Sequence, residues 1–199
     1  VVDGGSATFT GNIAGDGAWG VIQAKNGAQV SINANVSAEE SEDHYAMAVY
    51  ATGAGTKVTI SGGNFTQEIN GTDNQYDLIY ASGGAKIVIT GGTFKIGGGD
   101  PKWTLNCKDN SGSTITVMGG SFYKFDPSAP RANQADEVIV PDTCEVIKSG
   151  DWYTVVPKTV TATTGTDGKD NTIATVLDAN PTATEVAMNL PASETAYTL

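Results

Sequence analysis

The sequence carries little positive charge. Lysine and arginine together number 11 among 199 residues, against 22 acidic residues, and Arg131 is the single arginine. A formal net charge of −11 argues against binding to nucleic acid or to an anionic membrane, because phosphate contacts depend on clustered lysine and arginine. No apolar run approaches the roughly 20 residues that cross a bilayer as a helix, so no membrane insertion is expected.

Cysteine and histidine are also scarce. Cys107 and Cys144 lie 37 residues apart, with no further ligand at metal-binding spacing, and His44 is the single histidine. We therefore expect no metal site and no cofactor. Two alternatives stay open for the cysteines: buried thiols that pack as small apolar side chains, or a disulfide between the last regular repeat and the segment that follows it.

Glycine, by contrast, is abundant at 25 residues, and much of it belongs to a repeat. Four segments follow the pattern apolar-x-apolar-x-Gly-Gly-x-Phe or a close variant of it, and they start at Val30, Val58, Ile87 and Ile115. The starts are 28, 29 and 28 residues apart, and a degenerate copy starts at Val2. A regular period of this length predicts similar structural units stacked on one another.

Each period is expected to form three short strands. In the second period these are residues 45–50, 57–61 and 64–66, with Gly62 and Gly63 as a corner. Apolar and polar residues alternate within the strands, which is typical of strands with one buried face. Stacking would place Val30, Val58, Ile87 and Ile115 in one inward ladder, and Phe65, Phe94 and Phe122 in another. The sequence thus predicts an all-β fold, a right-handed single-stranded parallel β-helix of about five coils with a C-terminal β cap and a short β tail.

The chain is expected to divide into three regions. Residues 1–125 hold the coils, and residues 126–157 form a β cap whose hairpin carries Trp152 and Tyr153, because the open end of a stack exposes unpaired strand edges. Residues 158–199 are rich in threonine and alanine and predict a linker with an incomplete β module. We expect both ends of the chain to be completed by further segments or by partner subunits, so self-association is predicted.

The repeated motif is similar to that of a known group of proteins. The coils, of which the last continues as Gly119-Gly-Ser-Phe-Tyr-Lys-Phe-Asp-Pro127, resemble the GGTF-type β-helix proteins of gut bacteria and their phages. That group includes phage head-fibre or decoration proteins and surface proteins of anaerobes. The resemblance covers roughly residues 1–157 and implies a virion-surface, extracellular or cell-surface location, with capsid or fibre subunits as partners. It carries no catalytic residue over to this chain.

An enzyme must still be considered, because β-helix proteins include polysaccharide lyases and hydrolases. Such hydrolases use paired carboxylates, and the lyases use a basic side chain with calcium held by carboxylates. The outward positions of the predicted second strands form no aspartate ladder: they are Ser31, Lys57, Thr59, Lys86 and Thr116. The densest acidic run, residues 39–43, precedes His44 and is expected to be a solvated loop. We therefore expect no catalytic activity.

Aromatic residues suggest a binding role instead. Variable segments at residues 10–18, 37–44, 67–75 and 95–102 are expected to be loops, and an aromatic residue lies near the end of each: Trp19, Tyr45, Tyr76 and Trp103. Aromatic rings stack on the CH groups of pyranose sugars, so these four residues are candidate contacts for host or mucus glycans. The alternative is that they seal the core.

The sequence as a whole predicts a non-catalytic structural and adhesive surface module. A phage head-fibre or virion decoration protein that projects loops toward host glycans is the first interpretation. A bacterial cell-surface adhesin is the alternative, and a polysaccharide-cleaving enzyme is the least favoured.

Overall fold

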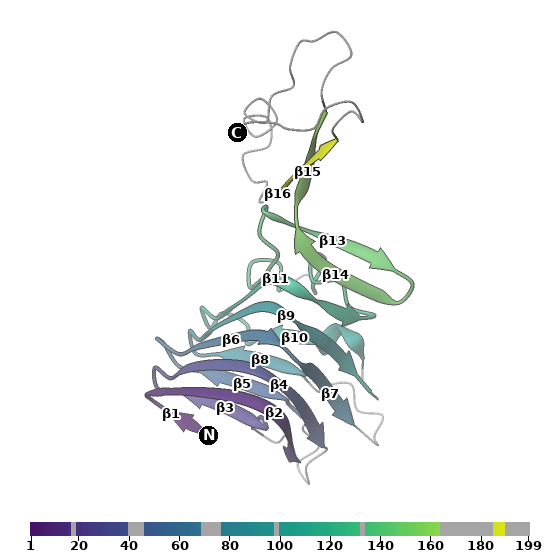
Figure 1. The fold of residues 1–199 in the computed structure, drawn as a ribbon. Helices are drawn as coiled ribbons and strands as arrows, with labels where there is room; N and C mark the ends of the chain where they lie inside the picture. The colour runs from purple at the N-terminus through teal and green to yellow at the C-terminus, as the bar shows by residue number, and fades with distance from the viewer. Residues whose placement is uncertain are drawn as a thin grey trace. The chain divides into compact units, whose positions relative to one another are not determined.

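The computed structural model describes residues 1–16, 19–39, 46–68, 77–97, 100–131, 134–163 and 185–189. The chain divides into two compact units, one of residues 1–141 and 146–156 and one of residues 142–145 and 157–199. Among the described residues the regular structure is β-strand, apart from the short 3-10 helix η1 (Pro101–Trp103). The repeats belong to the first unit, where their strands lie side by side in two sheets (Figure 1).

The smaller sheet has five strands, all parallel. In spatial order they are β1 (Val2–Asp3), β3 (Ile22–Lys25), β5 (Val49–Thr52), β8 (Ile79–Ser82) and β10 (Leu105–Cys107). Each repeat contributes one strand, so the spatial order follows the order along the chain.

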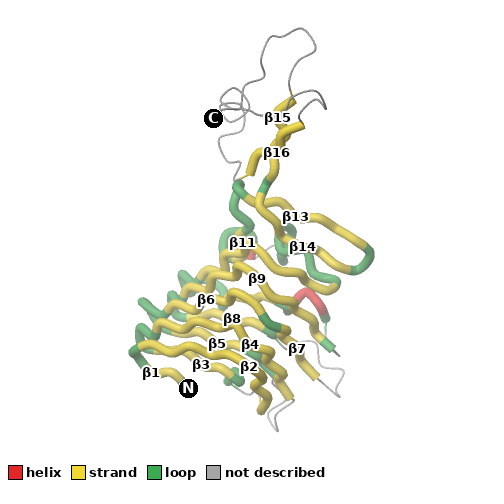
Figure 2. Tube along the Cα trace, in the orientation of Figure 1, coloured by secondary structure: helices red, strands yellow, loops and turns green. Residues whose placement is uncertain are grey.

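The larger sheet has nine strands and is mixed. Its parallel part consists of β2 (Ser6–Asp16), β4 (Gln29–Glu39), β6 (Lys57–Gly62), β7 (Asn64–Glu68), β9 (Lys86–Ile96), β11 (Thr114–Tyr123) and β12 (Val138–Ile139). The strand β14 (Trp152–Pro157) pairs antiparallel with β11, and β13 (Cys144–Ser149) lies next to β14. Figure 2 shows the long strands β2, β4 and β9 along this sheet.

The prediction of an all-β fold is confirmed, but the prediction of a right-handed single-stranded parallel β-helix is wrong. The structure has a five-stranded parallel sheet and a nine-stranded mixed sheet with an antiparallel pair, in place of coils of three short strands. The second and third strands expected in each repeat are joined in β4, β9 and β11, which run through the expected corner. The segments expected to be loops also start as strand, because β2, β4, β7 and β9 continue to Asp16, Glu39, Glu68 and Ile96.

The second unit contains a short parallel pair. Residues Thr159–Thr163 form β15 and residues Glu185–Asn189 form β16, and the two strands pair over their full length. The region 158–199 was expected to be an incomplete β module completed by another chain. The described part of it pairs within this chain.

The core of the first unit is built from inward ladders that cross the sheets. The predicted ladder of Val30, Val58, Ile87 and Ile115 is confirmed, since these residues are direct strand partners and are buried. The ladder of Phe65, Phe94 and Phe122 is confirmed as well. Their rings stack at 4.9 and 4.8 Å between centroids, which is the spacing of neighbouring strands. The smaller sheet adds a third ladder, formed by Ile22, Val49, Ile79 and Leu105.

Neighbouring repeats approach most closely at the Gly-Gly pairs. Gly63 has φ of +100°, and a Cβ placed on it would overlap the carbonyl oxygen of Ala34 in the preceding repeat. A Cβ on Gly91 would lie 2.5 Å from the carbonyl oxygen of Ser61. Glycine is required at these positions because another residue would push the repeats apart.

The two cysteines do not form a disulfide. Cys107 is buried, whereas Cys144 is half-buried. Burial is the main reason why the pKa of the Cys107 thiol is raised to about 12, and the carboxylates of Glu137 and Asp77 raise it further. Cys107 therefore packs as a small apolar residue of the core.

The phenylalanine ladder leads to a stability prediction. Replacing Phe94 with Ala removes the middle ring of the stack and should lower the free energy of unfolding by about 3 to 5 kcal/mol, because the stacked neighbours cannot close the cavity. Urea unfolding measures the loss. Lys86→Ala, an exposed change on the same strand, is the control and should cost at most about 0.5 kcal/mol. Equal losses in both variants would contradict the stacked core.

The glycine contacts lead to a second stability prediction. Gly63→Ala should destabilise the protein by more than about 2 kcal/mol, since it adds backbone strain to an overlap with the Ala34 carbonyl group. Gly15→Ala is the matched control, because a Cβ at Gly15 meets nothing within 4 Å. Thermal unfolding compares the two variants. A Gly63→Ala protein as stable as the control would show that the repeats are not held at this distance.

Candidate functional site

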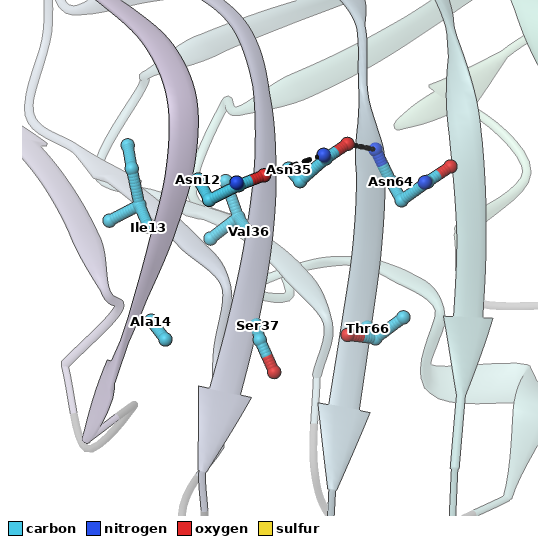
Figure 3. A pocket seen from close by; sticks show the side chains of 8 residues that line it. All are labelled: Asn12, Ile13, Ala14, Asn35, Val36, Ser37, Asn64 and Thr66. Carbon is cyan, nitrogen blue, oxygen red and sulfur yellow. Dashed lines mark hydrogen bonds between the residues drawn. The ribbon is translucent and has the colours of Figure 1, made fainter.

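A shallow groove lies on the face of the larger sheet that is turned away from the core. Its volume is about 320 Å³. It is formed by the second halves of β2 and β4 and by β7, and its lining residues are Asn12, Ile13, Ala14, Asn35, Val36, Ser37, Asn64 and Thr66 (Figure 3). The outward positions of these strands alternate with buried ones, so Asn35 is exposed while Val36 is buried.

Three asparagines form a row across the groove. Asn35 donates from Nδ2 to Oδ1 of Asn12 at 2.8 Å, and its own Oδ1 accepts from the backbone N–H of Asn64 at 2.9 Å (Figure 3). The row continues to Thr93, whose hydroxyl donates to Asn64 Oδ1. These hydrogen bonds hold the polar side chains at the spacing of the strands, about 4.8 Å. The groove thus presents a fixed array of amide and hydroxyl groups.

The row continues across β11 to the antiparallel strand β14. Thr93 is the strand partner of Ser121, and the hydroxyl of Ser121 is hydrogen-bonded to that of Thr154 on the antiparallel strand β14, at 2.9 Å. One line of amide and hydroxyl groups therefore crosses the outer face from β2 to β14.

A second row runs beside the first and becomes aromatic and cationic. Ser37 pairs with Thr66, and Thr66 pairs with Lys95 on β9. The Lys95 ammonium lies 5.0 Å from the centroid of the Tyr123 ring, and that ring lies 5.2 Å from Trp152 at an angle of 60°. Tyr123 and Trp152 are direct partners on β11 and β14. We call Lys95, Tyr123, Lys124 and Trp152 the cationic aromatic patch.

Of the four aromatic residues predicted to contact glycans, the structure describes Trp19 and Trp103, and neither is among the residues that line the groove. Trp19 has 64% of its surface exposed and its ring lies 6.2 Å from Tyr50, which in turn stacks on Tyr80 at 5.5 Å. Trp103 lies in η1, and the Arg131 guanidinium covers its ring at 3.8 Å. Tyr45 and Tyr76 lie outside the described residues. No described contact joins Trp19 to Trp103.

Sequence reasoning missed Tyr50 and Tyr80 as surface residues of the smaller sheet. They occupy the same position in two similar strands, Val-Tyr-Ala-Thr at residues 49–52 and Ile-Tyr-Ala-Ser at residues 79–82. The hydroxyl of Tyr50 is hydrogen-bonded to Ser82 at 2.9 Å. This local repeat was a usable signal. The asparagine row was missed because Asn12 was assigned to a loop and because the repeat spacing does not pair Asn35 with Asn64.

A polar cluster surrounds Asp77, which lies two residues before β8. Asp77 is the cross-strand neighbour of Trp103, because the N–H of Leu78 donates to the Trp103 carbonyl group. Its Oδ1 is enclosed and accepts no hydrogen bond, although the residue as a whole is only half-buried. Burial raises the pKa of Asp77 to about 7, against opposing effects of Asn106 and Arg131. Arg131 also donates to the side-chain oxygen of Asn106 at 3.3 Å, which ties the segment before β12 to the smaller sheet.

The described residues contain no candidate metal cluster and no candidate membrane-spanning helix. These residues contain no group of three or more His, Cys, Asp or Glu side chains that could hold an ion. Apart from Glu39, the acidic run ending at His44 lies outside them. No helix in the described part is long and apolar enough to cross a membrane.

The Asp77 cluster leads to a prediction about pH. The pKa of Asp77 is raised in the folded state, so the stability that its neutral form contributes is present below its ordinary value of 3.8 and is lost as the pH rises through about 7. Asp77→Asn should therefore stabilise the protein relative to the wild type more at pH 8 than at pH 4, by on the order of 3 kcal/mol.

Denaturant unfolding at the two pH values tests this prediction. Asp136→Asn removes an exposed carboxyl group and is the control, for which little change in relative stability is expected. If Asp77→Asn shows the same difference from the wild type at pH 4 and pH 8, the Asp77 carboxyl group is not enclosed as described.

Comparison with known proteins adds no relative to this description. No family model, no curated protein and no solved structure matches the chain.

Proposed function

We propose that this chain is a non-catalytic structural and adhesive module that binds glycans along the outer face of its larger sheet. The observation that carries the proposal is the groove with its fixed row of asparagines. Amide and hydroxyl side chains donate and accept at once, as sugar hydroxyl groups require. The strands that hold them are fixed by the core, so little ordering is needed when a ligand binds.

The repeat suits a ligand that is itself a repeating polymer. Equivalent positions on β2, β4 and β7 present Asn12, Asn35 and Asn64 at regular intervals. Beyond them, on the same face, Trp152 beside Tyr123 offers ring surface on which pyranose CH groups can stack. A glycan lying across the strands would meet polar contacts first and aromatic contacts at the β14 side.

The composition of the groove favours binding over cleavage. Glycoside hydrolysis uses two carboxyl groups on either side of the scissile bond. The eight described residues that line the groove are amides, hydroxyl-bearing or apolar residues, with no carboxylate among them. The absence of carboxylates among these lining residues therefore favours adhesion over cleavage.

The resemblance of the Gly-Gly-x-Phe segments to proteins of gut bacteria and their phages supports a place for this module on a surface. Our proposal is display on a phage virion, as a head-fibre or decoration protein with capsid or fibre subunits as partners. Display on a bacterial cell surface is the alternative. Host or mucus glycans would be the ligands in either setting.

Glycan binding is tested by titrating the protein with soluble glucan, galactan and mannan oligosaccharides in a calorimeter. We expect at least one to bind and to be recovered uncleaved. Asn35→Ala and Trp152→Ala should each weaken binding by about threefold to tenfold, because each removes a hydrogen-bonding or stacking group.

The control is Ser31→Ala, which alters an exposed residue of β4 outside the groove and should leave affinity unchanged. Absence of binding across the panel would contradict the proposal, as would binding that survives both groove variants. Shortened oligosaccharides after incubation would contradict the non-catalytic part of it.

A further inference from the structure

We infer that the cationic aromatic patch of Lys95, Tyr123, Lys124 and Trp152 is a subsite for a sugar that carries a negatively charged substituent. This inference rests on the proposed function, because it assigns a ligand class to one end of the same glycan-binding face.

The register of the strands places this patch in line with the groove. Thr66, which lines the groove, is the direct partner of Lys95. Phe94 pairs with Phe122, so the next residues, Lys95 and Tyr123, are also neighbours, and Tyr123 pairs with Trp152. A glycan that lies along the second row from Ser37 and Thr66 would therefore reach Lys95 and then the rings of Tyr123 and Trp152.

Two ammonium groups lie over one ring in this patch. Lys95 Nζ is 5.0 Å and Lys124 Nζ is 5.3 Å from the centroid of Tyr123. The ring quadrupole attracts both cations and so limits where their charges can lie. Both lysines are exposed, and they can therefore meet a ligand from solvent.

One carboxylate balances part of this charge. Asp151 lies 3.8 Å from Lys124 Nζ and accepts a hydrogen bond from the Tyr123 hydroxyl at 3.2 Å. Two lysines and one aspartate leave a local surplus of about one positive charge in a chain whose net charge is −11. Charges more than about 8 Å away are largely screened at physiological ionic strength, so the local surplus decides what binds at the patch.

The ligand that fits is a pyranose with an anionic group. Its CH face can pack against Trp152 or the edge of Tyr123, while a carboxylate or a sulfate ester approaches Lys95. The groove itself is lined by uncharged residues, so charge selection arises only where the row reaches Lys95.

The test compares sugars that differ only in charge. Neutral glucan, galactan and mannan oligosaccharides are titrated alongside their C6-carboxylated and C6-sulfated forms. The charged form of at least one backbone should bind about threefold to fivefold more tightly than the neutral form, which is the usual strength of one exposed ion pair. This preference should shrink as ionic strength rises from about 0.05 M to about 0.5 M.

Variants on one strand separate the local effect from net charge. Lys95→Gln should abolish the preference for the charged form, so that the ratio of the affinities for the charged and neutral forms falls to about one. Lys86→Gln changes net charge equally from another exposed position of β9 and should keep the preference. Circular dichroism confirms that both variants fold.

The outcomes distinguish the two proposals. If neutral and charged forms bind equally, or if Lys86→Gln acts like Lys95→Gln, the subsite inference is wrong while glycan binding stands. If neither form of any backbone binds, the proposed function fails. A preference for the carboxylated over the sulfated form, or the reverse, identifies which anion the patch takes.

Discussion

The close contact between neighbouring repeats at the Gly-Gly pairs is the constraint on which the first unit depends. Because Gly63 and Gly91 have no Cβ, the backbone of each repeat can lie against a carbonyl group of the repeat before it. The strands before and after each Gly-Gly pair can then stay hydrogen-bonded to the neighbouring repeats. That continuity brings the phenylalanine rings into stacking contact inside and the polar residues into rows outside. A larger residue at the bend would disturb both faces at once.

The inner face could be predicted from the sequence because two signals agree there. Alternation with period two marks which residues of a strand are buried, and the repeat spacing marks which residues are neighbours. Val58 and Ile87 illustrate this agreement, as both are buried and directly paired.

The number of strands in a repeat could not be predicted in the same way. A Gly-Gly pair is compatible with a corner that ends a strand and with a register shift inside one, and hydrogen bonding to neighbours decides between them. Nor does the repeat pattern contain the antiparallel strand β14, which follows a segment of different composition.

Whether the polar row on the outer face could be predicted depended on a shift of one residue in the strand register. Counting 28 residues from Asn35 reaches Gly63, whereas the structure places Asn64 beside Asn35. The reason is that Ile32 pairs with Ile60 and Val36 pairs with Phe65, so the later segment contains one residue more than the segment with which it pairs. Slipping a strand by one residue exchanges its two faces, so the asparagine row becomes visible only once that shift is known.

Asp77 shows a second limit of sequence reasoning. Its enclosure involves Trp103, Asn106 and Arg131, which lie 26 to 54 positions later in the chain.

The position of the carboxyl group with the raised pKa bears on our proposal that the chain binds glycans without cleaving them. A pKa near 7 in a cleft beside a second carboxylate is what a general acid requires, and it would point to catalysis. Asp77 has the raised pKa, but it lies just before β8 of the smaller sheet, beside Asn106 and Arg131, and its Oδ1 is enclosed. The groove lies on the larger sheet and is lined by uncharged side chains whose hydrogen bonds are directed along the strand ladder. The carboxyl group with the raised pKa and the groove of the proposed binding site thus lie on different sheets. In the proposed function, the fixed polar groups of the groove and the charged groups at its β14 side would select a glycan by shape and by charge.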